Sequence, residues 1–182
     1  MSLTKSKIER SLLYIEPGNV TLVSSFDGEK SNVMTISWTI ALDFKQKIAI
    51  CTGPWNHSFD IIMKTKECVV AIPPSSMAET VVKIGDISGK NVDKFEKFKL
   101  TKVEAEKVKA PLIGECVANL ECKVVDYVEK YGLIILQVVN LWENNDIKDA
   151  KFFHANGDGT FVEDGKKMDF RKFMNDKVPE GL

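Results

Sequence analysis

The sequence predicts a mainly β protein with short helices, arranged as a barrel. Six or seven runs are rich in β-branched and aromatic residues, and turn residues join several of them as hairpins. The runs with helical character between them are short, so we expect helices that decorate the barrel. The 182 residues suit one domain, 1–182, since a chain of this length can bury a sizeable core.

A hairpin is predicted near the start of the sheet. The segment GNVTLVSSF (18–26) is rich in β-branched residues, and NVMTISWTI (32–40) has the same character. Asp27-Gly28 lies between them and is a strong signal for a tight turn. The two segments are therefore expected to pair as antiparallel strands.

Two further strands are predicted at KIAICT (47–52) and ECVVAIP (67–73). A helix of about two turns, FDIIMKTK (59–66), is expected between them because its apolar residues fall on one side. The segment 75–86 predicts another helix, with Ser76 as N-cap and Glu79 at the capping-box position.

The second half of the chain predicts the longest strands. Residues 88–98 suggest a loop that enters a short helix, and 99–113 reads as a charged surface connection. The segments 115–130 and 131–144 are long and β-branched, which favours an antiparallel pair that forms one wall of the core. The tail after residue 155 is rich in Gly, Asp and Lys, typical of turns.

Charge and hydropathy exclude some classes of protein. The 25 basic and 26 acidic residues give a net charge of −1, so the basic surface that nucleic acids need is missing. The longest apolar runs, such as 131–139, are much shorter than the ~20 residues of a membrane helix. The N-terminus lacks the apolar stretch of a signal peptide, and we expect a soluble cytoplasmic protein.

Cysteine and histidine usage argues against disulfides and zinc. Four cysteines show no C-x-x-C spacing and lie in apolar segments, which predicts buried thiols in a reducing compartment; they are Cys51, Cys68, Cys116 and Cys122. The two histidines, His57 and His154, show no paired ligand spacing, so no metal site is predicted.

The strand at 32–40 has a row of hydroxyl side chains. Thr35, Ser37 and Thr39 alternate with apolar residues and would share one face of a strand. An ordinary amphipathic strand explains this pattern. A groove that receives a planar, hydrogen-bonding ligand explains it as well.

The stretch GPWNHSFD (53–60) joins a strand to a helix and carries several hydrogen-bond donors. Asn56 or Ser58 could cap the first N–H groups of the helix. The same N–H groups and the positive end of the helix dipole could instead bind an anion, and His57 would add a further donor. Asp60 argues mildly against the anion, since a carboxylate in the first turn already complements the dipole.

Two later segments could also carry chemistry. In SGKNVDKF (88–95), Gly89 allows close approach of the backbone and lysines offer charge to a phosphate, although a solvated loop is the simpler interpretation. His154 follows two aromatic residues, and a lone histidine is more often a structural partner than a catalyst. Neither G-x-G-x-x-G nor G-x-x-x-x-G-K-[ST] is present, so the chain lacks these two nucleotide-binding fingerprints.

In this order, PGNVTLVSS, NVMTISW, CTGPWNHSFDII, SGKNVDKF and APLIGECVANLECKV resemble the flavin reductase-like, FMN-binding split-barrel family. The flavoredoxin branch is the most similar. The resemblance runs from about residue 16 to 161 and implies a six-stranded split barrel, a homodimer, and FMN held noncovalently close to the subunit interface.

The resemblance also implies which residues bind the cofactor. The matching positions are Asn32, Thr35, Ser37, Trp38, Thr39, Cys51, Thr52, Asn56, His57, Ser58, Ser88, Gly89 and Lys94. The strand from Asn32 to Thr39 would lie along the isoalloxazine and the ribityl chain. The segment from Cys51 to Ser58 would close on the ribityl and phosphate, and the 88–94 loop would lie near the cofactor.

In such a protein the reactive chemistry belongs to the flavin, so no catalytic triad is expected. Thr35 or Ser37 could stabilise charge on the reduced ring, and His154 is the candidate for proton management. Cys51 is expected to be a buried strand thiol rather than a redox group.

The resemblance therefore implies an FMN-dependent oxidoreductase. It would take electrons from NAD(P)H or a small electron-transfer protein and pass them to an acceptor. A flavin-binding electron carrier or sensor is the alternative, and a split barrel that holds haem or a deazaflavin is a third possibility.

Overall fold

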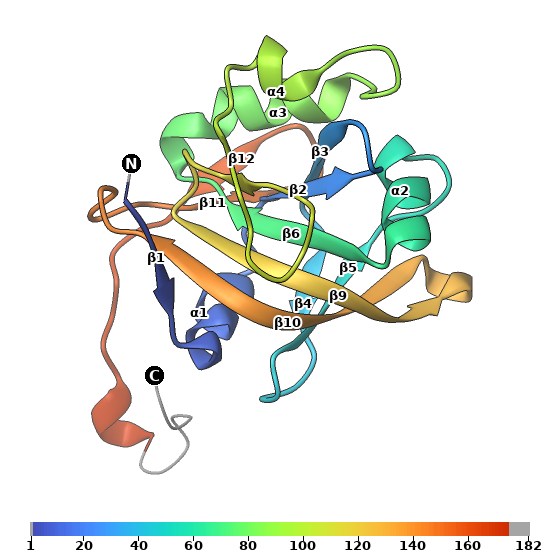
Figure 1. Cartoon of the computed structure of the whole chain (residues 1–182). Helices are drawn as coiled ribbons and strands as arrows, with labels where there is room; N and C mark the ends of the chain where they lie inside the picture. Colours follow the sequence, from blue (N-terminus) through green and yellow to red (C-terminus); the bar gives the residue numbers. More distant parts are fainter. Residues whose placement is uncertain (1, 175–182) are drawn as a thin grey trace.

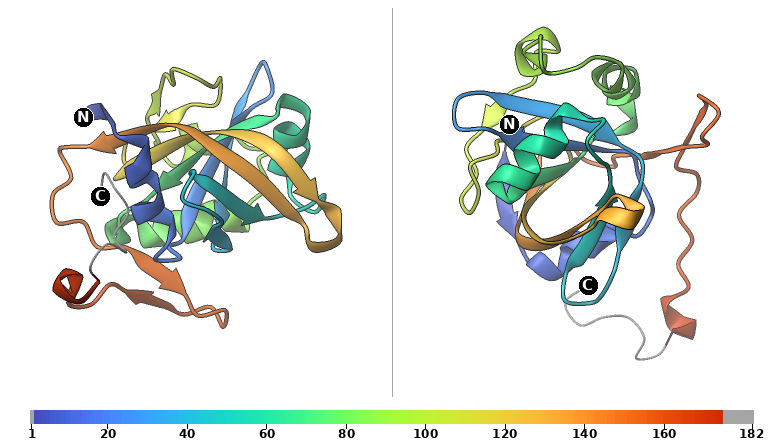
Figure 2. Two further views of the ribbon diagram at one scale, coloured as in Figure 1. Left: turned by 90° about the horizontal axis from the view of Figure 1, so that it is seen from below. Right: turned by 90° about the vertical axis from the view of Figure 1, so that its right-hand side faces the viewer.

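A computed structural model describes residues 2–174 (Figure 1). Its main sheet has the order β3-β2-β6-β9-β10-β5-β4, with β1 also paired to β10, and every pairing is antiparallel. The strands are β1 (Leu3–Ser6), β2 (Thr21–Phe26), β3 (Ser31–Ile36), β4 (Thr39–Ala41), β5 (Lys47–Cys51), β6 (Glu67–Ile72), β9 (Ala118–Val128) and β10 (Leu133–Asn144). Figure 2 shows this sheet curled around a central core.

Short helices and two small sheets complete the fold. The α-helices are α1 (Ser11–Ile15), α2 (His57–Thr65), α3 (Ala78–Asp86) and α4 (Lys94–Lys97). Single 3₁₀ turns are η1 (Ile8–Arg10), η2 (Ser75–Met77), η3 (Glu129–Tyr131) and η4 (Arg171–Phe173). The small sheets pair β7 (Lys102–Val103) with β8 (Leu112–Ile113), and β11 (Phe153–Ala155) with β12 (Phe161–Glu163).

The sheet buries apolar side chains on both of its faces. Val23 and Met34 belong to the cluster inside the curl, whereas their neighbours Leu22 and Val33 pack in a second cluster with residues of α3 and α4. Because successive strand residues point to opposite faces, each strand has adjacent apolar residues at this place, Leu22 and Val23 on β2 and Val33 and Met34 on β3. This packing fixes α3 and α4 against the outside of β3.

The long strands β9 and β10 form one wall of the barrel, as the sequence predicts. Their register shifts between Ile135 and Leu136 and again between Val138 and Asn140. Bulges of this kind bend a strand and increase its twist. The irregularities therefore help a pair of long strands to follow the curl of the sheet.

The segment 99–113, expected as a surface connection, is anchored to the barrel by a buried carboxylate. Glu121 on β9 accepts hydrogen bonds from the backbone N–H groups of Lys107 (2.5 Å) and Val108 (3.0 Å). It also accepts one from Trp142 Nε1 at 2.7 Å. Burial raises the pKa of Glu121, and these hydrogen bonds lower it by more, so the carboxylate stays ionised. The charged residues of the segment predict an exposed connection, so this anchor could not be read from the sequence.

Other local predictions had mixed outcomes. The hairpin around Asp27-Gly28 and the strands β5 and β6 are confirmed. The capping box at Ser76 is wrong, because Ser76 lies in η2 and Met77 precedes α3 without a side-chain cap. Glu79 instead pairs with Lys83 one turn along α3. Three cysteines are buried and free, as expected, while Cys51 is free and half-buried.

Candidate functional site

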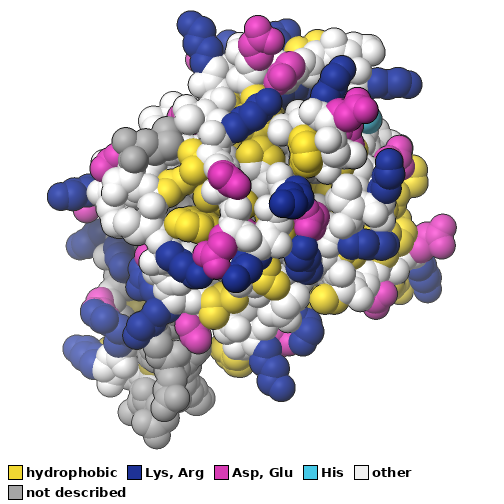
Figure 3. All heavy atoms as spheres, viewed as in Figure 1, with side chains coloured by type: hydrophobic (Ala, Val, Ile, Leu, Met, Phe, Trp, Pro, Cys, Tyr) yellow, Lys and Arg dark blue, Asp and Glu magenta, His cyan; other side chains and the backbone are white. Residues whose placement is uncertain are grey.

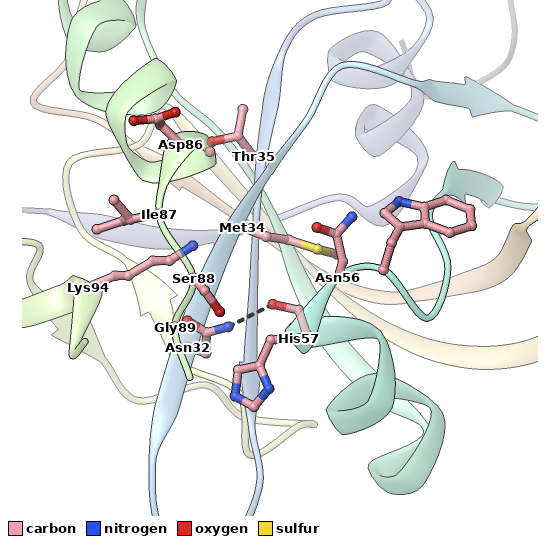
Figure 4. A pocket seen from close by; sticks show the side chains of 13 residues that line it. Asn32, Met34, Thr35, Asn56, His57, Asp86, Ile87, Ser88, Gly89 and Lys94 are labelled. Atoms are coloured by element: carbon pink, nitrogen blue, oxygen red, sulfur yellow. Dashed lines mark hydrogen bonds between the residues drawn. The ribbon is translucent and has the colours of Figure 1, made fainter. Parts of the chain in front are cut away.

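A pocket of about 180 Å³ lies between β3, the first turn of α2 and the loop that joins α3 to α4 (Figure 4). Eight of the predicted cofactor residues line it: Asn32, Thr35, Asn56, His57, Ser58, Ser88, Gly89 and Lys94. They come from three segments that are far apart in the sequence. The fold therefore brings together residues of three sequence motifs, NVMTISW, CTGPWNHSFDII and SGKNVDKF.

Asn32 is the polar centre of this pocket. Its side-chain nitrogen donates a hydrogen bond to Ser58 Oγ at 2.8 Å, but its Oδ1 has no partner although the side chain is only 5% exposed. A Cβ on Gly89 would lie 1.9 Å from that Oδ1, so only glycine leaves room for the amide. A buried acceptor without a donor is costly, which points to a ligand that supplies one.

The first turn of α2, which borders the pocket, has no side-chain cap. Asn56 precedes the helix but makes no side-chain cap; its amide nitrogen donates to Thr52 Oγ1 at 3.0 Å. Ser58 lies within the first turn, so the predicted N-cap role of both residues is wrong. With the first turn uncapped, its N–H groups and the helix dipole favour an anion.

Lys94 brings a buried positive charge to the same place. The side chain is held by α4, whose start is capped by Asp93 through the N–H of Glu96 at 3.1 Å. The residue is 4% exposed, and its Nζ donates to the carbonyl oxygen of Ile84 at 2.9 Å. Burial lowers the pKa of Lys94 to about 8. An anion beside the amine would restore the stability of its charged form.

The row of hydroxyls predicted along one strand does not exist. Thr35 Oγ1 donates to the carbonyl oxygen of Val81 at 2.6 Å and fixes α3 to the sheet. Ser37 is exposed in the break between β3 and β4. Thr39 begins β4, where its Oγ1 is buried without a partner. The break separates these side chains and leaves Thr35 alone at the pocket.

The remaining predicted residues form a neighbouring group rather than the pocket wall. Cys51 N–H donates to the carbonyl oxygen of Trp38 at 3.0 Å, which joins the start of β4 to the end of β5. Thr39 lies beside this junction, and Thr52 reaches the pocket only through Asn56. The group extends the candidate site from Asn56 toward the barrel end.

His154 does not line the pocket. Its Nε2 lies 2.7 Å from Asp164 Oδ1 and its Nδ1 lies 3.3 Å from the carbonyl oxygen of Gly18. It therefore links β11 to the segment after β12 and to the segment that precedes β2. The catalytic role expected for His154 finds no support in its position within this chain.

Sequence reasoning missed five residues of the pocket wall: Met34, Trp55, Gly85, Asp86 and Ile87. Trp55 lies across the backbone of Gly53, where a Cβ would come within 2.3 Å of the indole ring. The order Gly-Pro-Trp can be read from the sequence, but the contact between the indole ring of Trp55 and the backbone of Gly53 cannot. The end of α3 supplies the other wall only because α3 packs on β3.

Three further observations concern the surface, the helices and the possible metal ligands of residues 2–174. In Figure 3, basic and acidic side chains are interspersed over the visible face. Among the described residues, none of the helices is long and apolar enough to cross a membrane. In the same part of the chain, no three His, Cys, Asp or Glu side chains are grouped to hold a metal ion.

The fold and the pocket define a small β-barrel protein with a polar site at a helix start. Residues 13–161 match the model of the flavin reductase like domain. The chain therefore belongs to the flavin reductase-like family, and its curled sheet is the split barrel of that family, as the sequence motifs indicated.

Similar proteins agree with this assignment. The chain is 37% identical over 150 residues to an uncharacterized protein of Archaeoglobus fulgidus, covering 81% of this chain and 84% of the relative. An FMN-binding domain of a flavin reductases-like enzyme from Shewanella baltica has a TM-score of 0.84 at 19% identity, covering 92% and 97% of the two chains. Flavoredoxin of Desulfovibrio vulgaris has a TM-score of 0.76 at 21% identity, covering 84% and 89%. These structures share the fold.

Proposed function

We propose that this protein binds FMN noncovalently and acts as an oxidoreductase. It would pass electrons from NAD(P)H or an electron-transfer protein through the flavin to an acceptor. The observation that carries the proposal is the buried, unpartnered Asn32 Oδ1 in a pocket that also holds Lys94 and the open start of α2. Membership of the flavin reductase-like family supports the choice of ligand.

The pocket suits a polyol that ends in a phosphate. Lys94 and the first-turn N–H groups of α2 would hold the phosphate, because both favour negative charge. Asn32 Oδ1 repels an anion but would accept a hydrogen bond from a hydroxyl. A ribityl phosphate has both groups, and the Gly89 backbone leaves space for it beside Asn32.

The flavin ring would lie outside the enclosed part of the site. The pocket, at about 180 Å³, is smaller than the roughly 300–1,000 Å³ typical of small-molecule sites. The ring is expected beyond Asn56, near Thr39, Cys51 and Thr52. Bound flavin supplies hydride or single-electron chemistry, and these residues would position the ring and restrict water.

A second copy of the chain is proposed to cover that end of the site. Trp38 is 71% exposed and Trp55 is 73% exposed, and Ile40 and Tyr131 beside them are also exposed. Trp55 and Tyr131 are brought together where the Thr52 N–H bonds to the carbonyl oxygen of Gly132. A cluster of large apolar side chains of this kind marks an interaction surface. A homodimer would bury it and complete the flavin site.

The test is the visible spectrum of the purified protein, before and after anaerobic addition of NADH or NADPH. A flavin spectrum that bleaches with either nucleotide supports the oxidoreductase. A flavin spectrum that stays unchanged favours an electron carrier or sensor that receives electrons from another protein. Protein that stays colourless after FMN addition and gel filtration contradicts the proposal. A haem or deazaflavin spectrum would show that the barrel binds that cofactor instead of FMN. We also propose a cytoplasmic location, a reducing compartment in which the free thiol of Cys51 would stay reduced.

A further inference from the structure

Residues 165–174, which we call the arm, leave the barrel after a fixed anchor. Asp164 donates its N–H to the carbonyl oxygen of Phe152 at 3.0 Å, and its Oδ1 lies 2.7 Å from His154 Nε2. Among residues 2–174, the hydrogen bonds and ion pairs of the arm are all made inside the arm itself. Figures 1 and 2 show the segment running away from the barrel. Polar contacts therefore do not hold the arm on its own barrel.

The arm presents apolar side chains that its own chain leaves uncovered. Four of them are exposed: Met168, Phe170, Phe173 and Met174. The last turn is held in shape, because Arg171 pairs with Asp169 and the N–H of Phe173 donates to the carbonyl oxygen of Phe170 at 2.9 Å. The centroids of these two aromatic rings lie 6.4 Å apart. An ordered turn that exposes two aromatic rings is typical of a docking element rather than of a solvated tail.

A second exposed apolar surface lies where α1 packs beside β4. It consists of Leu13, Leu42 and Phe44, and Phe44 at the tip of the β4–β5 hairpin is 75% exposed. The tip is ordered, because Asp43 accepts the backbone N–H of Lys47 at 3.0 Å and pairs with the amine of the same residue. The hairpin therefore holds an aromatic ring in solvent in a fixed position.

The two surfaces carry opposite charges. The arm has four basic residues and one acidic residue, which are Lys166, Lys167, Arg171, Lys172 and Asp169. On the other surface, Leu13 is flanked along the chain by Glu9 and Glu16, both exposed. Neither carboxylate has a hydrogen-bond or ion-pair partner within residues 2–174. Opposite charges on two apolar surfaces favour their association and fix its orientation.

We propose that the arm of each subunit crosses to a second copy of the chain and packs on its surface of Leu13, Leu42 and Phe44. The inference rests on the proposed function, because it assumes the homodimer. Every second residue from 38 to 44 is apolar and exposed, so this surface continues the cluster proposed to face the second copy. The six residues of the arm that precede η4 span roughly 20 Å when extended, enough to reach over the edge of a neighbouring barrel. A two-fold axis repeats the contact, so each dimer buries two arms.

Cysteine cross-linking between mixed subunits tests where the arm docks. Phe173→Cys protein is mixed with Phe44→Cys protein, allowed to exchange subunits and oxidised with glutathione disulfide. Covalent dimers are expected in this mixture beyond the background of each variant alone. A mixture of Phe173→Cys with Val82→Cys, at an exposed apolar residue of α3, is the matched control and should give only background. In the double variant Phe44→Cys/Phe173→Cys, covalent dimers support the exchange, and an internal disulfide within a monomer overturns it.

The affinity between subunits gives a second measurement. Phe170→Ser/Phe173→Ser should raise the dissociation constant of the dimer by about tenfold or more, because two apolar rings lose their buried area. Glu9→Lys/Glu16→Lys should raise it as well, since the partner's arm is basic. Sedimentation velocity over a dilution series measures the constant, and Val82→Ser is the control that should leave it unchanged. All of these positions are exposed, and circular dichroism verifies that the variants fold.

The possible results separate this inference from the proposed function. An unchanged dissociation constant in Phe170→Ser/Phe173→Ser, or a mixture without covalent dimers, overturns the arm exchange and leaves the flavin site intact. A wild-type protein that is monomeric overturns it too. FMN titration of the same samples reports on flavin binding independently, because none of the arm residues lines the pocket.

Discussion

Asn32 on β3 donates a hydrogen bond to Ser58 Oγ in the first turn of α2, at 2.8 Å. Both side chains are buried, and 26 residues separate them in the chain. The bond holds the strand to the start of the helix and fixes the orientation of the Asn32 amide. Its free oxygen then faces the pocket beside Gly89, where a ligand hydroxyl can donate to it.

Ser58→Ala should weaken FMN binding by about tenfold or more. The change removes a hydroxyl from the phosphate end and leaves Asn32 without its partner. Calorimetric titration with FMN measures the effect, and Thr65→Ala at the other end of α2 is the control. Unchanged FMN affinity with lower stability would show that Ser58 is only structural.

Gly89→Ala should displace the Asn32 side chain, because the new methyl group would lie 1.9 Å from its Oδ1. We expect FMN affinity to fall by about tenfold, since the amide can no longer accept from the ligand and bond to Ser58 together. Gly165→Ala, where a Cβ meets nothing within 4 Å, is the control. An unchanged affinity would mean that the loop moves instead and that Asn32 is not a ligand.

FMN binding should weaken as the pH rises above about 8. The pKa of Lys94 is lowered to about 8 by burial, so the amine is largely charged below that pH and loses its charge above it. The charged amine is the form that attracts phosphate. Dissociation constants measured from pH 7 to 10 should rise above pH 8 in the wild type and stay flat in Lys94→Met. A parallel rise in that variant would exclude Lys94.

The same residue should lower the stability of the ligand-free protein at neutral pH. Because the folded pKa lies below the unfolded value of 10.5, the unfolded chain binds more protons between pH 8 and 10.5, and stability rises with pH across that window. Lys94→Met should raise the free energy of unfolding at pH 7 by about 1–3 kcal/mol and remove the rise. Urea unfolding without FMN measures both, with the exposed Lys97→Met as the control. A destabilised Lys94→Met variant would contradict this account.

Trp38→Glu should convert the proposed dimer into monomers, because it places a charge in the exposed apolar cluster. FMN should be retained less well, since the partner no longer covers the ring. Light scattering after size exclusion gives the mass, and Val82→Glu on α3 is a matched control at another exposed apolar residue. Wild-type protein that is monomeric at micromolar concentration would contradict the dimer.

Local sequence determined most of the barrel. The strands β2, β3, β5, β6, β9 and β10 follow from β-branched runs and from turn residues such as Asp27-Gly28, because strand and turn preferences act over a few residues. The family motifs also identified the residues near the pocket. The break after Ile36 was not predicted, since alternation continues through it and nothing local marks where β4 leaves β3 for β5.

Tertiary structure alone decided how the site works. Asn32, Gly89 and Lys94 meet because α3 and α4 pack on the outside of β3, and that packing also ties Thr35 to Val81 rather than to a ligand. Burial is a property of the whole fold, so the sequence could not show that Lys94 is enclosed or that Asn32 Oδ1 lacks a donor. The sequence named the family and its polar residues. Packing determined which of them are left with a hydrogen bond or a buried charge that a ligand can pair.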